Sequence, residues 1–191
     1  MATERITVNG REIVTLKELL RPGLKAVFVG LNPSRESVKK GHYYQGRLGR
    51  RFWNRLRDYS IVPALTEGAE DDDAFAHGYG FADLVRRPTR SGRELSKREK
   101  LAAVPDLLAR LSKMGDRPAI VSVYREAWRF AGLDLEKAGY RVLQMPGLYA
   151  KKEVVCHCMK ELRTALNRND RGKATTDNGP RTTDFWRHAN P

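Results

Sequence analysis

The stretch KAVFVGLNPS, residues 25–34, joins an apolar run of valine and phenylalanine to an asparagine followed by a proline. A continuous apolar run of this kind is typical of a strand that is buried on both faces. Asn32 then places a polar, uncharged side chain at the point where the strand ends. The basic and aromatic run KKGHYY, residues 39–44, follows within a few positions. The combination indicates a site at the end of a central strand.

Two later segments, RPAIVSVY at 117–124 and YRVLQMP at 140–146, have the same apolar character. Helical patterns lie between and after these strands, at residues 50–61, 96–114, 124–139 and 153–168. Alternation of apolar strands with helices is typical of parallel crossover units. We therefore expect an α/β fold, a three-layer α/β/α sandwich around a short, mainly parallel sheet. Ligands of such sheets bind outside the carboxyl ends of the strands.

The amino-terminal segment RITVNGREIVTL, residues 5–16, alternates apolar and polar residues around Asn9-Gly10, which predicts a small β-hairpin. The LKELL segment that follows, residues 16–20, favours a helical turn. A chain of 191 residues is long enough for one domain with a well-filled core, which we assign to residues 1–166. Residues 167–191 are poor in aliphatic side chains, and we expect them to form a disordered basic tail.

Positive charge is concentrated in two segments of the chain. The 36 Lys+Arg against 23 Asp+Glu give a formal net charge of +13. Residues 35–57 hold eight Lys/Arg and one Glu, a net of +7, and residues 86–100 hold seven Lys/Arg and two Glu, a net of +5. An acidic loop at residues 67–73 lies between them. Such segregated positive charge favours a polyanion, so we expect nucleic acid as the partner.

Cysteine usage and hydropathy indicate the kind of environment in which the protein works. Cys156 and Cys158 are too few for a disulfide framework or a four-cysteine cluster, and on a helix they point in different directions. No apolar segment is long enough to span a bilayer, and the amino terminus lacks a signal-peptide pattern. We expect a cytoplasmic monomer without a membrane anchor, a metal or another cofactor.

Three motifs, in order, resemble those of one enzyme family. They are GLNPSRESVKKGHYY followed by RRFW within residues 30–53, GYGFADLVRRPT at 78–89, and MPGLYAKK at 145–152. Their order and spacing are similar to those of the mismatch-specific uracil-DNA glycosylase and thymine-DNA glycosylase family, and the resemblance covers residues 20–166. It implies the fold expected above, and an enzyme that extrudes a base from duplex DNA and hydrolyses its glycosidic bond.

The first motif would supply the pocket for this reaction. An amide cannot act as a base at neutral pH, but its oxygen can hold a water in line for attack, which gives Asn32 a catalytic role. The resemblance assigns Thr89 to the same water and the ring of Tyr44 to stacking on the extruded base. Backbone N–H groups of the turn would stabilise the departing base. The further base-binding candidates are Gly30, Leu31, Pro33, Ser34 and His42, the last either lining the pocket or bonded to a backbone carbonyl.

Asp83 departs from the family pattern, which has asparagine or lysine at this position. One interpretation is a helix cap or an ion pair with Arg86 or Arg87. The other is a catalytic role, because burial in the cleft beside Asn32 would raise the pKa of the carboxyl and suit it to general-base catalysis. Such a base would extend activity to leaving groups poorer than uracil. We place Asp83 among the catalytic candidates.

The third motif predicts a loop that enters the duplex. It has no histidine, whereas the uracil-specific branch has an imidazole in the corresponding loop, so recognition would rest on backbone groups. Inserted apolar or long side chains offset the stacking that is lost when a base leaves, and a lysine meets phosphate. A plain solvated loop is the alternative. The DNA-binding candidates are Lys40, Gly147, Leu148, Tyr149, Lys151 and Lys152.

These motifs favour a monofunctional DNA glycosylase that excises uracil, and by extension thymine or other lesions, opposite guanine. No lysine nucleophile is assigned, so strand cleavage is not expected. Two other functions stay open: a non-catalytic nucleic-acid-binding module on the same scaffold, and a small-molecule nucleotide hydrolase with residues 30–34 as a phosphate cradle. The hydrolase is the weaker of the two because that turn has a single glycine and no Walker-type lysine follows it.

Overall fold

The central sheet has four parallel strands in the order β4-β3-β5-β6. The computed structural model describes residues 3–8, 10–63, 65–147 and 149–171, with only the backbone described over 168–171. Within these residues the strands are β3 (Ala26–Gly30), β4 (Tyr79–Asp83), β5 (Ala119–Ser122) and β6 (Val142–Gln144). All four are buried along their whole length, as expected of parallel strands covered on both faces.

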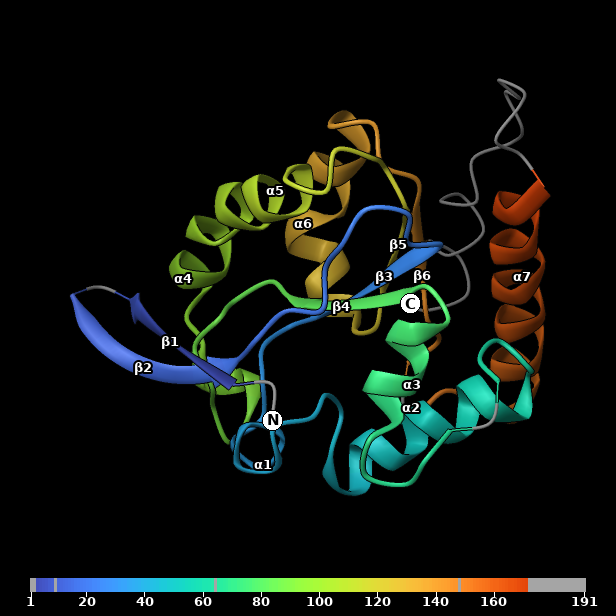
Figure 1. The fold of residues 1–191 in the computed structure, drawn as a ribbon, viewed down its shortest axis with the longest axis horizontal. Coiled ribbons are helices and arrows are strands. Elements are labelled where there is room, and N and C mark those ends of the chain that lie inside the picture. Colours follow the sequence, from blue (N-terminus) through green and yellow to red (C-terminus); the bar gives the residue numbers. More distant parts are fainter. Residues whose placement is uncertain (1–2, 9, 64, 148, 172–191) are drawn as a thin grey trace.

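Helices cover both faces of this sheet (Figure 1). One layer consists of α2 (Gly46–Asp58), α3 (Glu70–Ala76) and α7 (Lys152–Arg171), and the other of α4 (Lys97–Ala102), α5 (Val104–Ser112) and α6 (Arg125–Lys137). Along the strands, successive side chains alternate between the two cores: Phe28 packs with the first layer, and its neighbours Val27 and Val29 pack with the second. The predicted three-layer α/β/α sandwich is confirmed.

The same alternation determines what reaches the carboxyl edge of the sheet. Gly30 and Asp83 pair in register at the ends of β3 and β4. Each lies two residues beyond a phenylalanine of the first core, Phe28 or Phe81, so both face the layer of α2 and its aromatic side chains. The strand order also reverses at β3, which lies between β4 and β5, and open α/β sheets bind ligands at such a point.

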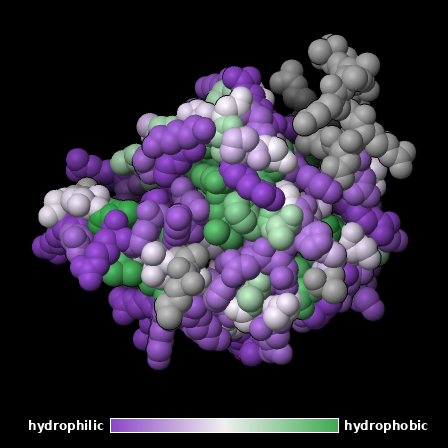
Figure 2. Space-filling view, viewed as in Figure 1, coloured by the Kyte–Doolittle hydropathy of each residue, from purple (hydrophilic) through white to green (hydrophobic). Residues whose placement is uncertain are grey.

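The predicted hairpin is formed by β1 (Thr3–Val8) and β2 (Arg11–Leu16), which pair antiparallel and project from the body of the molecule (Figure 1). Apolar side chains gather over this hairpin on the face shown in Figure 2, within a largely hydrophilic surface. The prediction of a helical turn at residues 16–20 is wrong. Leu19 forms an antiparallel bridge with Phe81 instead, through N–H to O contacts of 3.0 Å and 3.1 Å.

Three further features differ from the sequence-based expectations. A short helix, α1 (Arg35–Lys40), follows β3, and most of the expected acidic loop belongs to α3. Helix α7 continues to Arg171, so the tail predicted to begin at residue 167 starts inside a helix; residues 172–191 lie outside the described residues. Among the helices of the described segments, none is long and apolar enough to cross a membrane.

Candidate active site

The amide of Asn32 has a fixed orientation at the end of β3. Its Nδ2 atom lies 2.9 Å from the carbonyl oxygen of Arg87, 3.3 Å from that of Pro33 and 2.7 Å from Oγ1 of Thr89. Carbonyl oxygens only accept hydrogen bonds, so the amide nitrogen has to face them. The amide oxygen is therefore turned away from these carbonyls, where it can accept a hydrogen bond from a water.

Thr89 lies under this amide and is 2% exposed. Its hydroxyl donates to the carbonyl of Ser91 at 2.9 Å and accepts from Asn32. The hydroxyl proton is therefore used in a hydrogen bond to the backbone, and the direct role of Thr89 in this structure is to orient the amide of Asn32. Its predicted contact with the water stays a prediction.

The backbone joins the first two motifs directly. Ser34 and Thr89 form a parallel bridge, with the Thr89 N–H donating to the Pro33 carbonyl at 3.1 Å. Just before it, the Leu84 N–H donates to the Gly30 carbonyl at 3.0 Å. The two segments therefore extend the β3–β4 pairing beyond the sheet, and this extension sets the position of Asn32 relative to Asp83.

Asp83 is a buried carboxyl with an incomplete hydrogen-bond set. Its side chain is 3% exposed, and within the described residues Oδ2 has no hydrogen-bond partner. Burial, together with the negative charge of Glu18, raises the pKa of this carboxyl to about 8, against the lowering effect of Arg110 and Arg86. The alternative role as a helix cap is wrong, because Asp83 ends a strand. Its side chain makes no ion pair with Arg86 or Arg87 among the described contacts.

The hydroxyl of Tyr44 and the carboxyl of Asp83 both lie close to Gly30. A Cβ atom at Gly30 would overlap Asp83 Oδ1 and lie 3.1 Å from the Tyr44 hydroxyl oxygen, so a larger residue there would displace the Asp83 carboxyl. The Tyr44 hydroxyl is also buried without a hydrogen-bond partner among the described residues. Two buried polar atoms without a partner in the described part of the chain, the Tyr44 hydroxyl and Asp83 Oδ2, therefore belong to side chains that both approach Gly30. Such atoms are costly in a folded protein and are typical of sites that complete their hydrogen bonds with a ligand.

The ring of Tyr44 belongs to the aromatic core. It is 9% exposed, and its centroid lies 4.1 Å from that of Phe52 and 6.2 Å from those of Trp53 and Phe81. Tyr44 has a φ of 52°, which is uncommon for a residue with a side chain. Gly49 permits this backbone path, because a Cβ there would overlap the Tyr44 carbonyl. Stacking of this ring on an extruded base stays a prediction.

The predicted wedge loop, residues 145–152, is anchored from α2. Arg55 donates to the carbonyls of Pro146 at 2.7 Å and Gly147 at 3.1 Å, and the Arg51 guanidinium lies 5.5 Å from the ring centroid of Tyr149. Tyr149 is 78% exposed and available to a partner. Lys151 and Lys152 are exposed at the start of α7, and Leu148 lies outside the described residues.

Comparison with known proteins agrees with this geometry. The uracil DNA glycosylase superfamily matches over residues 18–171, most of the chain. The chain belongs to the uracil DNA glycosylase superfamily. A curated relative, a G/U mismatch-specific uracil DNA glycosylase of Schizosaccharomyces pombe, is 38% identical over 76 residues, which is 39% of this chain and 23% of that protein. The predicted family is therefore confirmed, and the match spans about a quarter of the length of this relative.

The remaining first-motif candidates of this superfamily member differ in exposure. Leu31 is 7% exposed and packs into the core beside α5, so only its backbone can meet a ligand. Ser34 is the N-cap of α1, and its hydroxyl accepts the Ser37 N–H at 3.0 Å. Lys40 is exposed at the end of α1, 3.7 Å from Glu36, where it can reach a phosphate.

His42 has a partner that neither prediction named. Its Nδ1 atom lies 2.8 Å from Oδ1 of Asp71, a fully buried carboxylate that also accepts the Tyr43 N–H at 2.8 Å. Asp72 completes a group whose potential ligand atoms lie within 4.8 Å of one another. The contact ties the residues before Tyr44 to α3. The expected absence of a metal stays a prediction.

Two residues near Asp83 were missed at the level of sequence. Tyr124, the half-buried N-cap of α6, has its ring centroid 6.5 Å from that of Tyr44, and burial together with the charge of Asp83 raises its pKa to about 12. Glu18 is buried behind Asp83. The apolar run before Tyr124 predicts a strand, so it could have indicated that Tyr124 lies at the carboxyl edge of the sheet. No local pattern marks Glu18.

Proposed function

We propose that this protein is a monofunctional DNA glycosylase that excises uracil from G:U mismatches in duplex DNA. The observation that carries the proposal is the fixed amide of Asn32 beside the buried carboxyl of Asp83, both at the carboxyl edge of the sheet. An amide oxygen held in this way can place a water without deprotonating it. The G/U mismatch-specific uracil DNA glycosylase of Schizosaccharomyces pombe, a partial relative, supports the same substrate.

The protonation of Asp83 fits the departure of a pyrimidine anion. With a pKa of about 8, the carboxyl is largely neutral at pH 7, so it does not repel the negative charge that develops on the leaving uracil. For this leaving group, bond breaking can run ahead of water attack, and positioning by Asn32 supplies the main catalytic contribution. A base that is half ionised near pH 8 is also suited to accept a proton from the water as the pH rises.

The same carboxyl supports a broader substrate range as part of this proposal. Thymine and other lesions leave less readily than uracil, so the attacking water has to carry more of the transition state. Asp83 would then act as general base, with the Tyr44 hydroxyl facing the same space. Positioning of the extruded base would use the backbone of the turn at Gly30–Ser34 and an aromatic ring, either Tyr44 or Tyr124.

Exposed cations at this edge would hold the duplex. Arg35, Lys39, Lys40, Lys151 and Lys152 come from α1 and from the segment that opens α7, the elements nearest the first and third motifs. Phosphate contacts of this kind position the protein without reading the sequence. DNA affinity should therefore fall steeply as the salt concentration rises.

A duplex with one G:U pair and a labelled strand tests the proposal. After incubation with the protein, alkali cleaves the strand only where a base has been released. Strand breakage with alkali and none without it is expected for the wild type, and Asn32→Ala should lose most of the activity. Binding without abasic sites would overturn the proposal in favour of a binding module. Activity on free nucleotides with none on DNA would favour a nucleotide hydrolase.

A further inference from the structure

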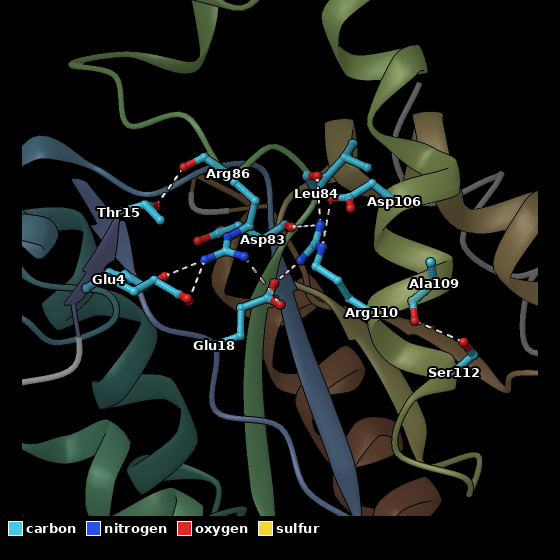
Figure 3. A network of polar contacts seen from close by, with 11 residues as sticks. Glu4, Thr15, Glu18, Asp83, Leu84, Arg86, Asp106, Ala109, Arg110 and Ser112 are labelled. Atoms are coloured by element: carbon cyan, nitrogen blue, oxygen red, sulfur yellow. Dashed lines mark hydrogen bonds and ion pairs between the residues drawn. The ribbon is translucent and has the colours of Figure 1, made fainter. Parts of the chain in front are cut away.

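A buried ion pair lies next to Asp83 (Figure 3). Glu18, from the strap that follows the hairpin, contacts Arg110 of α5 through Oε1 and Nη1. The two side chains are 9% and 10% exposed, so most of their charge is removed from water. Buried ion pairs contribute little net stability compared with apolar residues of similar size. Stability alone therefore does not explain why this pair is present.

This pair holds both backbone polar groups of Asp83. The Asp83 N–H, at the outer edge of β4, donates to the Glu18 carboxylate. Arg110 Nη2 donates to the Asp83 carbonyl at 3.1 Å and to the Leu84 carbonyl at 3.3 Å. Glu18, Arg110 and the peptide groups of Asp83 therefore form a closed ring of contacts around the residue that carries the catalytic carboxyl.

Two further residues, Asp106 and Arg86, fix the ring in place. Arg110 Nε donates to Asp106 at 2.8 Å, one turn earlier on α5. Arg86 lies 3.9 Å from the second oxygen of Glu18 and reaches back to Glu4 of the hairpin at 2.7 Å and to the Leu16 carbonyl at 3.0 Å. The hairpin, the strap, β4 and α5 thus meet at this cluster, which gives the projecting hairpin a connection to the active site.

We propose that the Glu18–Arg110 ion pair positions Asp83 and sets the charge that its carboxyl experiences. The inference rests on the proposed function, because positioning matters only if Asp83 takes part in excision. Other groups that act on Asp83 are Arg86, just beyond β4, and the phenols of Tyr43, Tyr44 and Tyr124 from the segments before α2 and α6. The phenols keep their protons over the working pH range. Glu18 and the two arginines are the charged members.

Opposite charges in the pair give opposite expectations for two variants. Glu18→Gln keeps the size and an acceptor for the Asp83 N–H but removes a negative charge, so Asp83 should titrate at lower pH. Arg110→Met removes a positive charge and leaves Glu18 less neutralised, so Asp83 should titrate at higher pH. The double variant removes both charges and should titrate between the two. If the ion pair has only a structural role, both variants should lose stability, and the pH at which Asp83 titrates should not move in opposite directions.

The experiment measures the titration of Asp83 without relying on activity. The free energy of unfolding is followed from pH 4 to pH 9 for each variant with and without Asp83→Asn, and the difference within each pair reports the Asp83 titration. Arg163→Met, on the exposed face of α7, is the control and should leave the titration in place. Shifts of the Asp83 titration in one direction only, or no shifts, would overturn the proposal.

If Arg110→Met fails to fold, Glu18→Gln and Arg110→Lys decide. Glu18→Gln must lower the pH at which Asp83 titrates, and Arg110→Lys must leave that pH near the wild-type value.

Single-turnover excision on the G:U duplex gives the second readout. The pH profile of excision for each variant should move in the same direction as its unfolding titration. Arg110→Met should also slow excision roughly ten- to a hundredfold at pH 7, because the carbonyls of Asp83 and Leu84 lose their hydrogen bonds to Arg110. If the wild type releases no base, the proposed function fails, and the unfolding titrations still decide the role of the pair. If the titrations shift as expected but the excision profiles do not, the ion pair has no catalytic effect and this inference fails alone.

Discussion

The Nδ2 atom of Asn32 lies 2.7 Å from Oγ1 of Thr89, across 57 residues of sequence. This contact joins the first motif to the second and, with the Arg87 carbonyl, decides which end of the amide faces the site. A threonine that follows a proline would otherwise be an ordinary turn residue. Here it is one of the three acceptors that keep the amide of Asn32, a candidate catalytic group, in one orientation.

We predict that Thr89→Val slows excision less than Asn32→Ala does. The valine keeps the volume but removes one of the three acceptors of the amide, whereas alanine removes the amide itself, at an expected cost of about a hundredfold or more. Single-turnover rates on a G:U duplex measure both. The double variant should be no slower than Asn32→Ala, because Thr89 acts through the Asn32 amide, which is already absent. Additive losses would show that Thr89 has a separate role.

The cost of Asp83→Asn should depend on the leaving group and on pH. With uracil the change should cost little at pH 7, because the carboxyl is largely protonated there. With thymine the wild-type rate should rise as the pH increases through about 8, where the base form of the carboxyl appears, and the asparagine variant should lack this rise. Rates on two lesions from pH 6 to pH 9 check this. A rise that survives in the variant would assign it to another group.

Asp83→Asn should also change the pH dependence of stability. The folded-state pKa of about 8 lies above the ordinary value of 3.8, so the contribution of this carboxyl to stability is fully present below pH 4 and is lost as the pH rises towards 8. Asparagine does not titrate. The variant should therefore gain on the wild type over this window, by on the order of 1–3 kcal/mol at the alkaline end, because the unfolded wild-type carboxyl ionises whereas the folded one has to keep its proton. Urea unfolding at several pH values measures the difference, and a constant difference would contradict the buried position of the carboxyl.

Two substitutions at Tyr44 should separate its ring from its hydroxyl. Tyr44→Ala removes a large buried ring and should destabilise the fold by about 3–5 kcal/mol. Tyr44→Phe removes only a hydroxyl that has no partner among the described residues, so stability should change by less than about 1 kcal/mol. Any loss of excision in the phenylalanine variant then reports the hydroxyl above Gly30. Full activity in that variant would exclude the hydroxyl from catalysis.

Arg55→Ala should weaken the recognition of a mismatch more than binding to intact DNA. The guanidinium holds two successive carbonyls of the wedge loop, and its loss frees that loop without removing a group from the duplex-facing surface. We expect a roughly tenfold lower preference for a G:U duplex over a matched duplex, measured by competition binding. Arg50→Ala, an exposed residue of the same helix with the same charge, is the control. An equal effect from both changes would assign the loss to charge alone.

The sequence predicted the strands whose apolar runs are continuous, such as β3, because burial on both faces leaves a local signal. It did not predict β4 as a strand, since two glycines, Gly78 and Gly80, and the terminal Asp83 interrupt the pattern. The helical turn at residues 16–20 was wrong because Leu19 is held by pairing with Phe81, a contact 62 positions away that overrides local preference.

The candidate site was predictable where a motif marks it and hidden where only tertiary contacts do. Asn32, Thr89 and Asp83 were named from the motifs, and the structure brings all three to one edge of the sheet. Glu18 was missed because its partners, Asp83 and Arg110, lie far along the chain. The spacing of charged residues within one segment does not indicate contacts with residues that are distant in the sequence.

The Leu19–Phe81 bridge has a consequence for self-association. An uncovered outer strand of a sheet offers its N–H and C=O groups to any extended chain, which is a common route to aggregation. The strap between the hairpin and β3 covers the outer side of β4 at Phe81, and the Glu18 carboxylate accepts the next outward N–H, that of Asp83. A form of the protein cut before Lys25 would expose this side. Its first defect would be poor solubility, which an activity assay alone would misread as damage to the catalytic groups.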